Sequence, residues 1–220
     1  MSQKYNIDLY LKFRQSIKCG DALEWRSETT LGKSIRFITG YEVNHTSQVI
    51  TFDQFYNGIP LRIYTLEALS HGIELNLLSR RLENFKGKIY WLPLKDEFKN
   101  YRKEILIENF KNLNKSQLEK KAKLSYNTNN VYEEMSRLGL ERIGIPYDFS
   151  SIKKIFFKVL FFGSHSIQSS LDKLYCSEYV FYNGKDTGLP IIDKFKKAVP
   201  VPGEMIFTGW YKDKILIHNT

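Results

Sequence analysis

Short apolar segments separated by turn residues fill the chain up to residue 94, and they constrain its fold more than any other feature. Polar and apolar residues alternate in segments such as His45–Phe52, and this period of two is typical of β-strands. Strands are predicted at Asp21–Trp25, His45–Phe52, Leu61–Ala68, Gly72–Leu77 and Lys88–Leu94. Because the turns between them are short, we expect an antiparallel meander.

Helical periodicity replaces this alternation in the middle of the chain. A helical insertion is expected over about residues 97–140, with helices at Glu97–Phe110, Ser116–Leu124 and Asn130–Leu140. Shorter helices are predicted at Leu31–Ile38 and Cys176–Tyr182, and closing strands at Glu204–Trp210 and Lys214–His218. The chain is therefore predicted to have an α+β fold.

The length and composition fit one large domain that spans residues 1–220. Hydrophobic residues make up 42% of the chain and charged residues 26%, which are ordinary values for a globular protein. No repeat or clear interdomain linker interrupts the sequence. The aromatic content of 15% favours a core that contains β-structure or a groove lined with aromatic side chains.

The formal net charge of +9 has two interpretations, and the composition does not decide between them. It suits an anionic partner such as a nucleic acid, an anionic membrane or an acidic cell-wall polymer. It is equally what a Lys-rich, AT-rich genome produces without selection. The basic residues are spread along the chain and no nucleic-acid motif is visible, which argues against nucleic acid as the partner.

The sequence favours a cytoplasmic location. Residues 1–8 contain no apolar signal region, and no apolar run approaches the roughly 18 residues of a transmembrane helix. The longest apolar run, Ile155–Phe162, is interrupted by Lys158 and is interpreted as a buried helix rather than as a membrane-touching loop. A phage or effector protein released by lysis is an alternative.

The chain has two cysteines, Cys19 and Cys176, too few for a disulfide scaffold. Ser177 and Glu178 follow Cys176 directly, which suits the first turn of a helix better than a core strand. A cysteine at a helix N-terminus has a lowered thiol pKa and is a candidate nucleophile. Cys19 lies in a turn before Gly20 and is interpreted as structural.

A nucleophilic thiol needs a general base, and four histidines are available. His45 opens a predicted strand and is preferred over histidines that fall in turns or near the end of the chain. Glu67 closes the strand that begins at Leu61. Such a carboxylate either orients an imidazole or is simply a solvated strand end, and the residues alone leave both interpretations open.

In their order and spacing, these residues resemble the circularly permuted NlpC-type cysteine hydrolases of the YiiX-like branch. That family shares a papain-like fold with relatives of lecithin-retinol acyltransferase, and the permutation places its His before its Cys. The resemblance covers nearly the whole chain. It rests on Gly20-Asp21, Thr39-Gly40-Tyr41, His45, Glu67-Ala68, Gly72-Ile73, Gly144–Asp148, Tyr175–Glu178 and Val199–Pro202.

The resemblance implies an antiparallel sheet or barrel packed against helices, with Cys176 as nucleophile, His45 as base and Glu67 orienting the imidazole. Tyr41 and Tyr147 are candidates for substrate binding or for an oxyanion hole. The family commonly has Ser before its His, whereas this chain has Asn44.

The expected function is a thiol protease or amidase that cleaves an amide bond in a peptide, such as the stem of a peptidoglycan fragment. A lipid acyltransferase or thioesterase of the same fold, and a catalytically inactive basic binding module, are the alternatives. Neither a metal nor an organic cofactor is implied. The sequence does not indicate the oligomeric state.

Overall fold

The computed structural model describes residues 8–52, 55–56, 59–60, 62–99, 131–148, 174–196 and 198–220. The predicted helix Ser116–Leu124, most of Glu97–Phe110 and the apolar run Ile155–Phe162 lie outside these ranges. Of the expected helical insertion, the described part is limited to the helices α4 (Asp96–Lys99) and α7 (Val131–Glu141) at its two ends.

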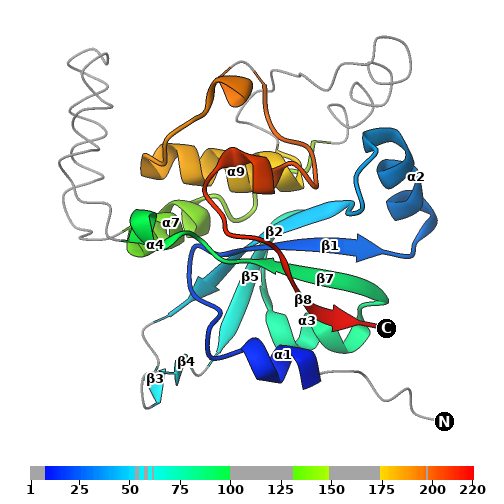
Figure 1. Ribbon diagram of the computed structural model, residues 1–220, viewed down its shortest axis with the longest axis horizontal. Coiled ribbons are helices and arrows are strands. Elements are labelled where there is room, and N and C mark those ends of the chain that lie inside the picture. The colour runs from blue at the N-terminus through cyan, green and yellow to red at the C-terminus, as the bar shows by residue number, and fades with distance from the viewer. Residues whose placement is uncertain are drawn as a thin grey trace.

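A six-stranded antiparallel sheet forms the centre of the molecule, with the strand order β6-β5-β2-β1-β7-β8 (Figure 1). Its strands are β1 (Ala22–Ser27), β2 (His45–Thr51), β5 (Ile63–Leu69), β6 (Gly72–Leu77), β7 (Gly87–Leu92) and β8 (Ile215–Asn219). A separate small hairpin consists of β3 (Phe55–Tyr56) and β4 (Ile59–Pro60). The predicted α+β class and antiparallel sheet are thus confirmed. Strands β1, β2, β5 and β6 follow one another as a meander, and β7 then returns to pair with the free side of β1.

Helices cover both faces of this sheet (Figure 1). The remaining helices are α1 (Asp8–Phe13), α2 (Thr30–Thr39), α3 (Leu78–Asn84), α9 (Cys176–Thr187) and two 3₁₀ turns, η1 (Asp193–Phe195) and η2 (Met205–Thr208). Helices α7 and α9 lie on one face, α1 and α3 on the other, and α2 lies beyond the ends of β1 and β2. None of the helices in the described ranges is long and apolar enough to cross a membrane.

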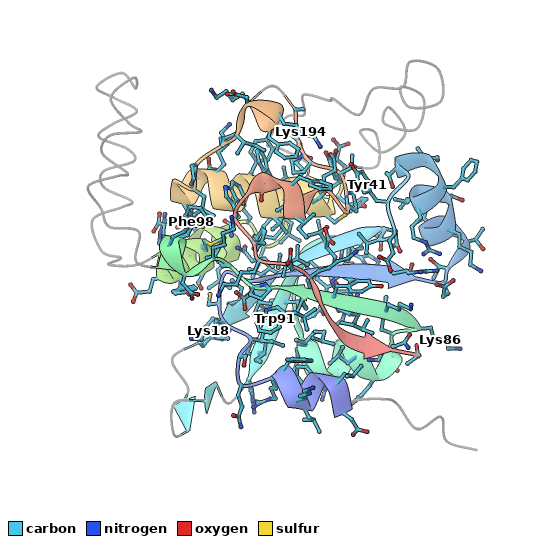
Figure 2. The ribbon with its side chains drawn as sticks, viewed as in Figure 1. Lys18, Tyr41, Lys86, Trp91, Phe98 and Lys194 are labelled. Atoms are coloured by element: carbon cyan, nitrogen blue, oxygen red, sulfur yellow. The ribbon has the colours of Figure 1, made fainter. Side chains whose placement is uncertain are left out.

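Alternation along the strands divides the core into two layers. On β1, Ala22 faces the core under α9, whereas Leu23 and Trp25 face the core over α1 and α3. Figure 2 shows side chains filling both layers, with Phe98 on the α7 side and Trp91 on the α1 side. The period of two that predicted the strands is therefore also what produces the two layers.

The prediction of a strand at Glu204–Trp210 is wrong, because this segment forms η2. The Phe207 N–H donates to the Glu204 carbonyl at 2.9 Å, so the backbone is hydrogen-bonded locally rather than to a strand. Gly209 then ends the turn in the left-handed region, at φ 83°, which breaks an extended conformation. A short apolar run does not by itself distinguish a strand from a helical turn.

Candidate active site

Cys176 is the first residue of α9, as the sequence predicts, and the helix runs on to Thr187. Glu178 holds this end in place, because its Oε2 accepts a hydrogen bond from the Tyr175 N–H at 3.2 Å. Burial is the main reason why the pKa of Glu178 is raised to about 8. The Cys176 side chain is almost completely buried, and α9 packs against β2. The thiol thus lies at a fixed helix N-terminus close to the strand that carries His45.

His45 is the first residue of β2, and its Nε2 lies 3.1 Å from Oε2 of Glu67. Burial lowers the pKa of His45, but hydrogen bonds and charge interactions with Cys176 and Glu67 outweigh it and raise the pKa to about 9. The imidazole is therefore hydrogen-bonded to the carboxylate and interacts with the thiol. The structure brings together all three residues that the sequence analysis named as a triad.

Glu67 lies on β5 and is completely buried. The Thr65 hydroxyl donates to its Oε1 at 2.7 Å, and the Arg81 guanidinium donates to both carboxylate oxygens, each at 2.9 Å. Burial alone would raise the pKa of Glu67, but His45 and Arg81 lower it to about 2. The carboxylate is charged at any ordinary pH, and its complete burial excludes the interpretation as a solvated strand end.

Arg81 is a residue of this site that the sequence analysis missed. It lies on α3, an unpredicted helix, and its guanidinium lies 5.3 Å from the centre of the Trp25 ring. Leu78 and Leu82 are both buried and stand four residues apart, which is the helical signal that was available. Nothing in that signal relates Arg81 to Glu67, because the two residues meet only through the packing of α3 on β5.

This combination of fold and site can be compared with known proteins. No protein-family model matches the chain, and no curated protein matches it in sequence. A solved structure does match, the crystal structure of the metalloprotein YiiX from Escherichia coli O157:H7, with a TM-score of 0.51 and 15% identity. The match covers 92% of this chain and 97% of that chain. The chain has a YiiX-like fold.

YiiX is a metalloprotein, and a metal ion in the present chain would need several converging His, Cys, Asp or Glu side chains. Within the described ranges, no group of three or more His, Cys, Asp or Glu side chains could hold one. Both oxygens of Glu67 already accept hydrogen bonds from Arg81, and a carboxylate engaged in this way is a poor metal ligand. The site around His45 and Glu67 therefore does not fit a metal.

Tyr147 approaches the site through the segment that follows α7. Tyr147 pairs with Leu174 in a parallel bridge, because the Leu174 N–H donates to the Pro146 carbonyl and the Asp148 N–H to the Leu174 carbonyl, both at 3.2 Å. Burial, together with the charges of Cys176 and Asp148, holds the pKa of Tyr147 well above its ordinary value. The Gly144–Asp148 motif thus places a neutral phenol beside the thiol.

Tyr41 is engaged differently. It lies between α9 and α2 (Figure 2), and its hydroxyl donates to Oε1 of Glu204 at 3.0 Å. Burial and the neighbouring Glu204 raise its pKa to about 12. A Cβ at Gly203 would come within 2.5 Å of the Tyr41 Cβ, so the Pro-rich turn packs tightly on this ring. The hydroxyl proton of Tyr41 is directed to Glu204, and the contact anchors the turn.

Two other motifs have structural contacts. Asp21 accepts hydrogen bonds from the Trp91 indole N–H at 2.7 Å and from the Leu94 N–H at 2.8 Å, which ties β1 to β7. Asn44, at the position where the family commonly has Ser, accepts from the Ser27 N–H at 2.7 Å through its side-chain oxygen. Asn44 therefore fixes the strand end that presents His45.

Cys19, unlike Cys176, has no imidazole as a neighbour among the described residues. Its Sγ lies 2.8 Å from the Ser136 hydroxyl, and burial raises the pKa of the thiol. Both cysteines are free. Their surroundings differ, because Cys19 packs against α7 while Cys176 contacts His45.

Proposed function

We propose that the chain is a cysteine-dependent hydrolase with a permuted papain-like arrangement, acting on amide bonds of peptides such as peptidoglycan-fragment stems. The observation that carries the proposal is the continuous series of contacts from Cys176 to His45 to Glu67. In an enzyme of this kind a nucleophile contacts a base, and a third group orients the base. The NlpC-type resemblance supports the same assignment of roles.

The hydrogen bond between His45 and Glu67 determines which imidazole nitrogen serves the thiol in the proposed reaction. Because His45 Nε2 faces Glu67, Nδ1 is the nitrogen left for the thiol. The Cys176 thiolate attacks the carbonyl carbon, and the imidazolium donates its proton to the leaving amine as the C–N bond breaks. Water then attacks the acyl-enzyme, His45 accepts a proton from it, and the carboxylic acid leaves as the thiolate re-forms. Glu67 keeps the imidazole in one orientation throughout.

The tetrahedral intermediate needs hydrogen-bond donors for its oxyanion. The Cys176 N–H, at the start of α9, is one donor, since the first N–H groups of a helix have no partner within it. Tyr147 is the candidate for the second donor, because it lines the cavity beside His45 and interacts with Cys176, whereas Tyr41 anchors the Pro-rich turn through Glu204. The neutral form favoured by the raised pKa of Tyr147 retains the proton that it would donate.

The test compares Cys176→Ala with Cys19→Ala on a panel of muropeptides, acyl-lipids and simple esters. We expect Cys176→Ala to abolish turnover, because the nucleophile is lost, whereas Cys19→Ala retains most of it. Melting temperatures establish that both variants are folded. Equal losses in two folded variants would contradict the assignment of Cys176. A salt-dependent shift with DNA or RNA, without turnover of any substrate, would favour the binding module instead.

A further inference from the structure

A cavity of about 230 Å³ opens beside His45. It lies where β1 and β5 end and β2 begins, between α2 and α3, and both His45 and Tyr147 line it. Helix α9, which begins at Cys176, packs against β2, which begins at His45, so the cavity adjoins the base that serves the thiol in the proposed reaction. A substrate group bound there would be attached close to the carbonyl that Cys176 attacks.

The walls of this cavity are mainly apolar. Helix α2 contributes Leu31 and Ile35, and the other apolar walls are Trp25, Ala68, Leu69 and Phe85. Gly32 lets α2 approach this closely, because a Cβ there would come within 2.2 Å of the Ser27 hydroxyl oxygen. Apolar walls of this kind bind hydrocarbon groups by removing them from water.

The charges around the cavity favour an uncharged occupant. Among the described residues that line it, the ionisable groups are His45, Arg81 and Tyr147. Arg81 is neutralised by its two hydrogen bonds to Glu67, and His45 is part of the reacting series. A free carboxylate or ammonium placed in the cavity would lose its hydration without gaining an unpaired counter-ion.

The volume limits the length of the group. Pockets for drug-sized ligands enclose roughly 300–1,000 Å³, and this cavity is smaller. It suits an aliphatic side chain or a short acyl chain, rather than the full length of a membrane lipid chain.

We propose that this cavity is the subsite for a short, uncharged apolar group adjoining the scissile carbonyl of the substrate. The inference rests on the proposed function, since it takes Cys176 as the nucleophile. The group is either an aliphatic side chain of a peptide or the chain of a short acyl ester, and the two share the same chemistry. The enzyme then selects substrates by the length and the lack of charge of this apolar group.

The test uses alkyl methanethiosulfonates, which transfer an S-alkyl group to a thiolate, form a disulfide and release methanesulfinate. Methyl, butyl and dodecyl reagents are compared at Cys176 by mass spectrometry, with each rate divided by the rate for glutathione. We expect the butyl reagent to react about tenfold faster than the methyl one, the factor that burying roughly two methylenes gives. The dodecyl reagent should gain nothing further.

Two substitutions on α2 locate the effect. Ile35→Trp fills the cavity and should bring the butyl-to-methyl ratio close to one, while Ile35→Ala should move the optimum to a longer chain. Phe37→Ala is the matched control, because Phe37 lies on the same helix but is 86% exposed and does not line the cavity. The control should retain the wild-type ratio.

Each other outcome has a distinct meaning. A flat chain-length profile, with Cys176 still reacting faster than Cys19, would overturn the subsite and leave the proposed function standing. A tenfold ratio that survives Ile35→Trp in a folded protein would also overturn it, because the chain would then bind elsewhere. If the methyl reagent reacts no faster at Cys176 than at Cys19, the proposed function itself fails.

Leucyl and glycyl peptide amides, and butyrate and acetate esters, distinguish the two sources of the apolar group. Faster turnover of the leucyl amide than of the glycyl one would identify a peptide side chain. Faster turnover of butyrate than of acetate, without a response to the peptides, would identify an acyl chain. Equal turnover within both pairs would contradict the subsite.

Discussion

At the scale of single residues, the most informative contact is the one between Arg81 and Glu67. A buried carboxylate without a partner would take up a proton and could no longer steady an imidazolium. Arg81 donates to both oxygens of Glu67 and thereby keeps the carboxylate charged beside His45. It is a positioning residue, since in the proposed reaction it acts on the thiol only through Glu67 and His45.

Replacing Arg81 should lower kcat more than it changes KM. We expect Arg81→Lys to be impaired about tenfold and Arg81→Gln more, because Lys keeps the charge but loses the two-pronged geometry, while Gln loses both. The acidic limb of the pH–rate profile should move to higher pH, since Arg81 is one of the two groups that lower the pKa of Glu67. A Lys variant with wild-type kinetics would contradict a role for this geometry.

The residue scale is also where prediction from sequence is least complete. The order of Cys, His and Glu along the chain allowed the three candidates to be named, since each begins or closes an element. The contact between His45 and Glu67 depends on the register of β2 against β5, which no local pattern fixes. Arg81 could not be predicted, because its role depends on where α3 packs.

At the scale of elements, the start of α9 presents the thiol. Glu178 accepts the Tyr175 N–H and so satisfies a backbone group that the helix leaves without a partner. The strands of the sheet were predicted well, because one buried face imposes an alternation that is visible in the sequence. Helices α1 and α3 were missed, because six or seven residues are too few for a helical period to stand out.

Removing the Glu178 side chain should destabilise the protein. Glu178→Ala should lower the free energy of unfolding by about 1 kcal/mol, the usual cost of a lost cap, and slow the alkylation of Cys176 by loosening its helix end. Glu178→Gln is the matched control, because it keeps an acceptor for the Tyr175 N–H. Chemical denaturation measures the stability. If Gln proves as damaging as Ala, the hydrogen bond to the Tyr175 N–H is not what stabilises this end of the helix.

At the scale of the whole molecule, the net charge of +9 does not describe the interior. Glu24, on β1, is buried, and its Oε1 has no hydrogen-bond partner among the described residues. Burial raises its pKa from 4.5 to about 7, although Lys214 and the Gly203 backbone oppose the shift. The folded chain therefore holds a carboxyl proton that the unfolded chain releases at lower pH.

This shift predicts a pH dependence of stability. Because the pKa of Glu24 is higher in the folded state, its contribution to the free energy of unfolding is complete below pH 4.5 and is lost as the pH rises to about 7. Glu24→Gln should therefore stabilise the protein at pH 8 by about 1–3 kcal/mol and change little at pH 4. Denaturation at the two pH values measures this. A variant that is less stable than wild type at pH 8 would show that the charged form of Glu24 is needed.

More of the overall fold than of the candidate active site could be predicted from the sequence. Alternation and short turns predicted an antiparallel sheet with helices, and the YiiX-like match agrees with that class. The position of β7 next to β1 was not predictable, because it pairs strands that are far apart in the sequence. Through that pairing, β7 and the edge strand β8 are added to the side of β1 that faces away from β2 and β5, the strands that carry His45 and Glu67.

The central claim is that His45 and Glu67 activate the Cys176 thiol, and alkylation by iodoacetamide against pH tests it most directly. The rate is measured at each cysteine by mass spectrometry, in the wild type and in Glu67→Gln. We predict that Cys176 reacts faster than Cys19 below neutral pH, because His45, with its pKa raised to about 9, is a cation there, whereas burial raises the pKa of the Cys19 thiol. Glu67→Gln should slow Cys176 and leave Cys19 unchanged. If Cys176 instead follows the pH dependence of a free thiol, with a pKa of about 8.5, and Glu67→Gln changes nothing, the claim is contradicted.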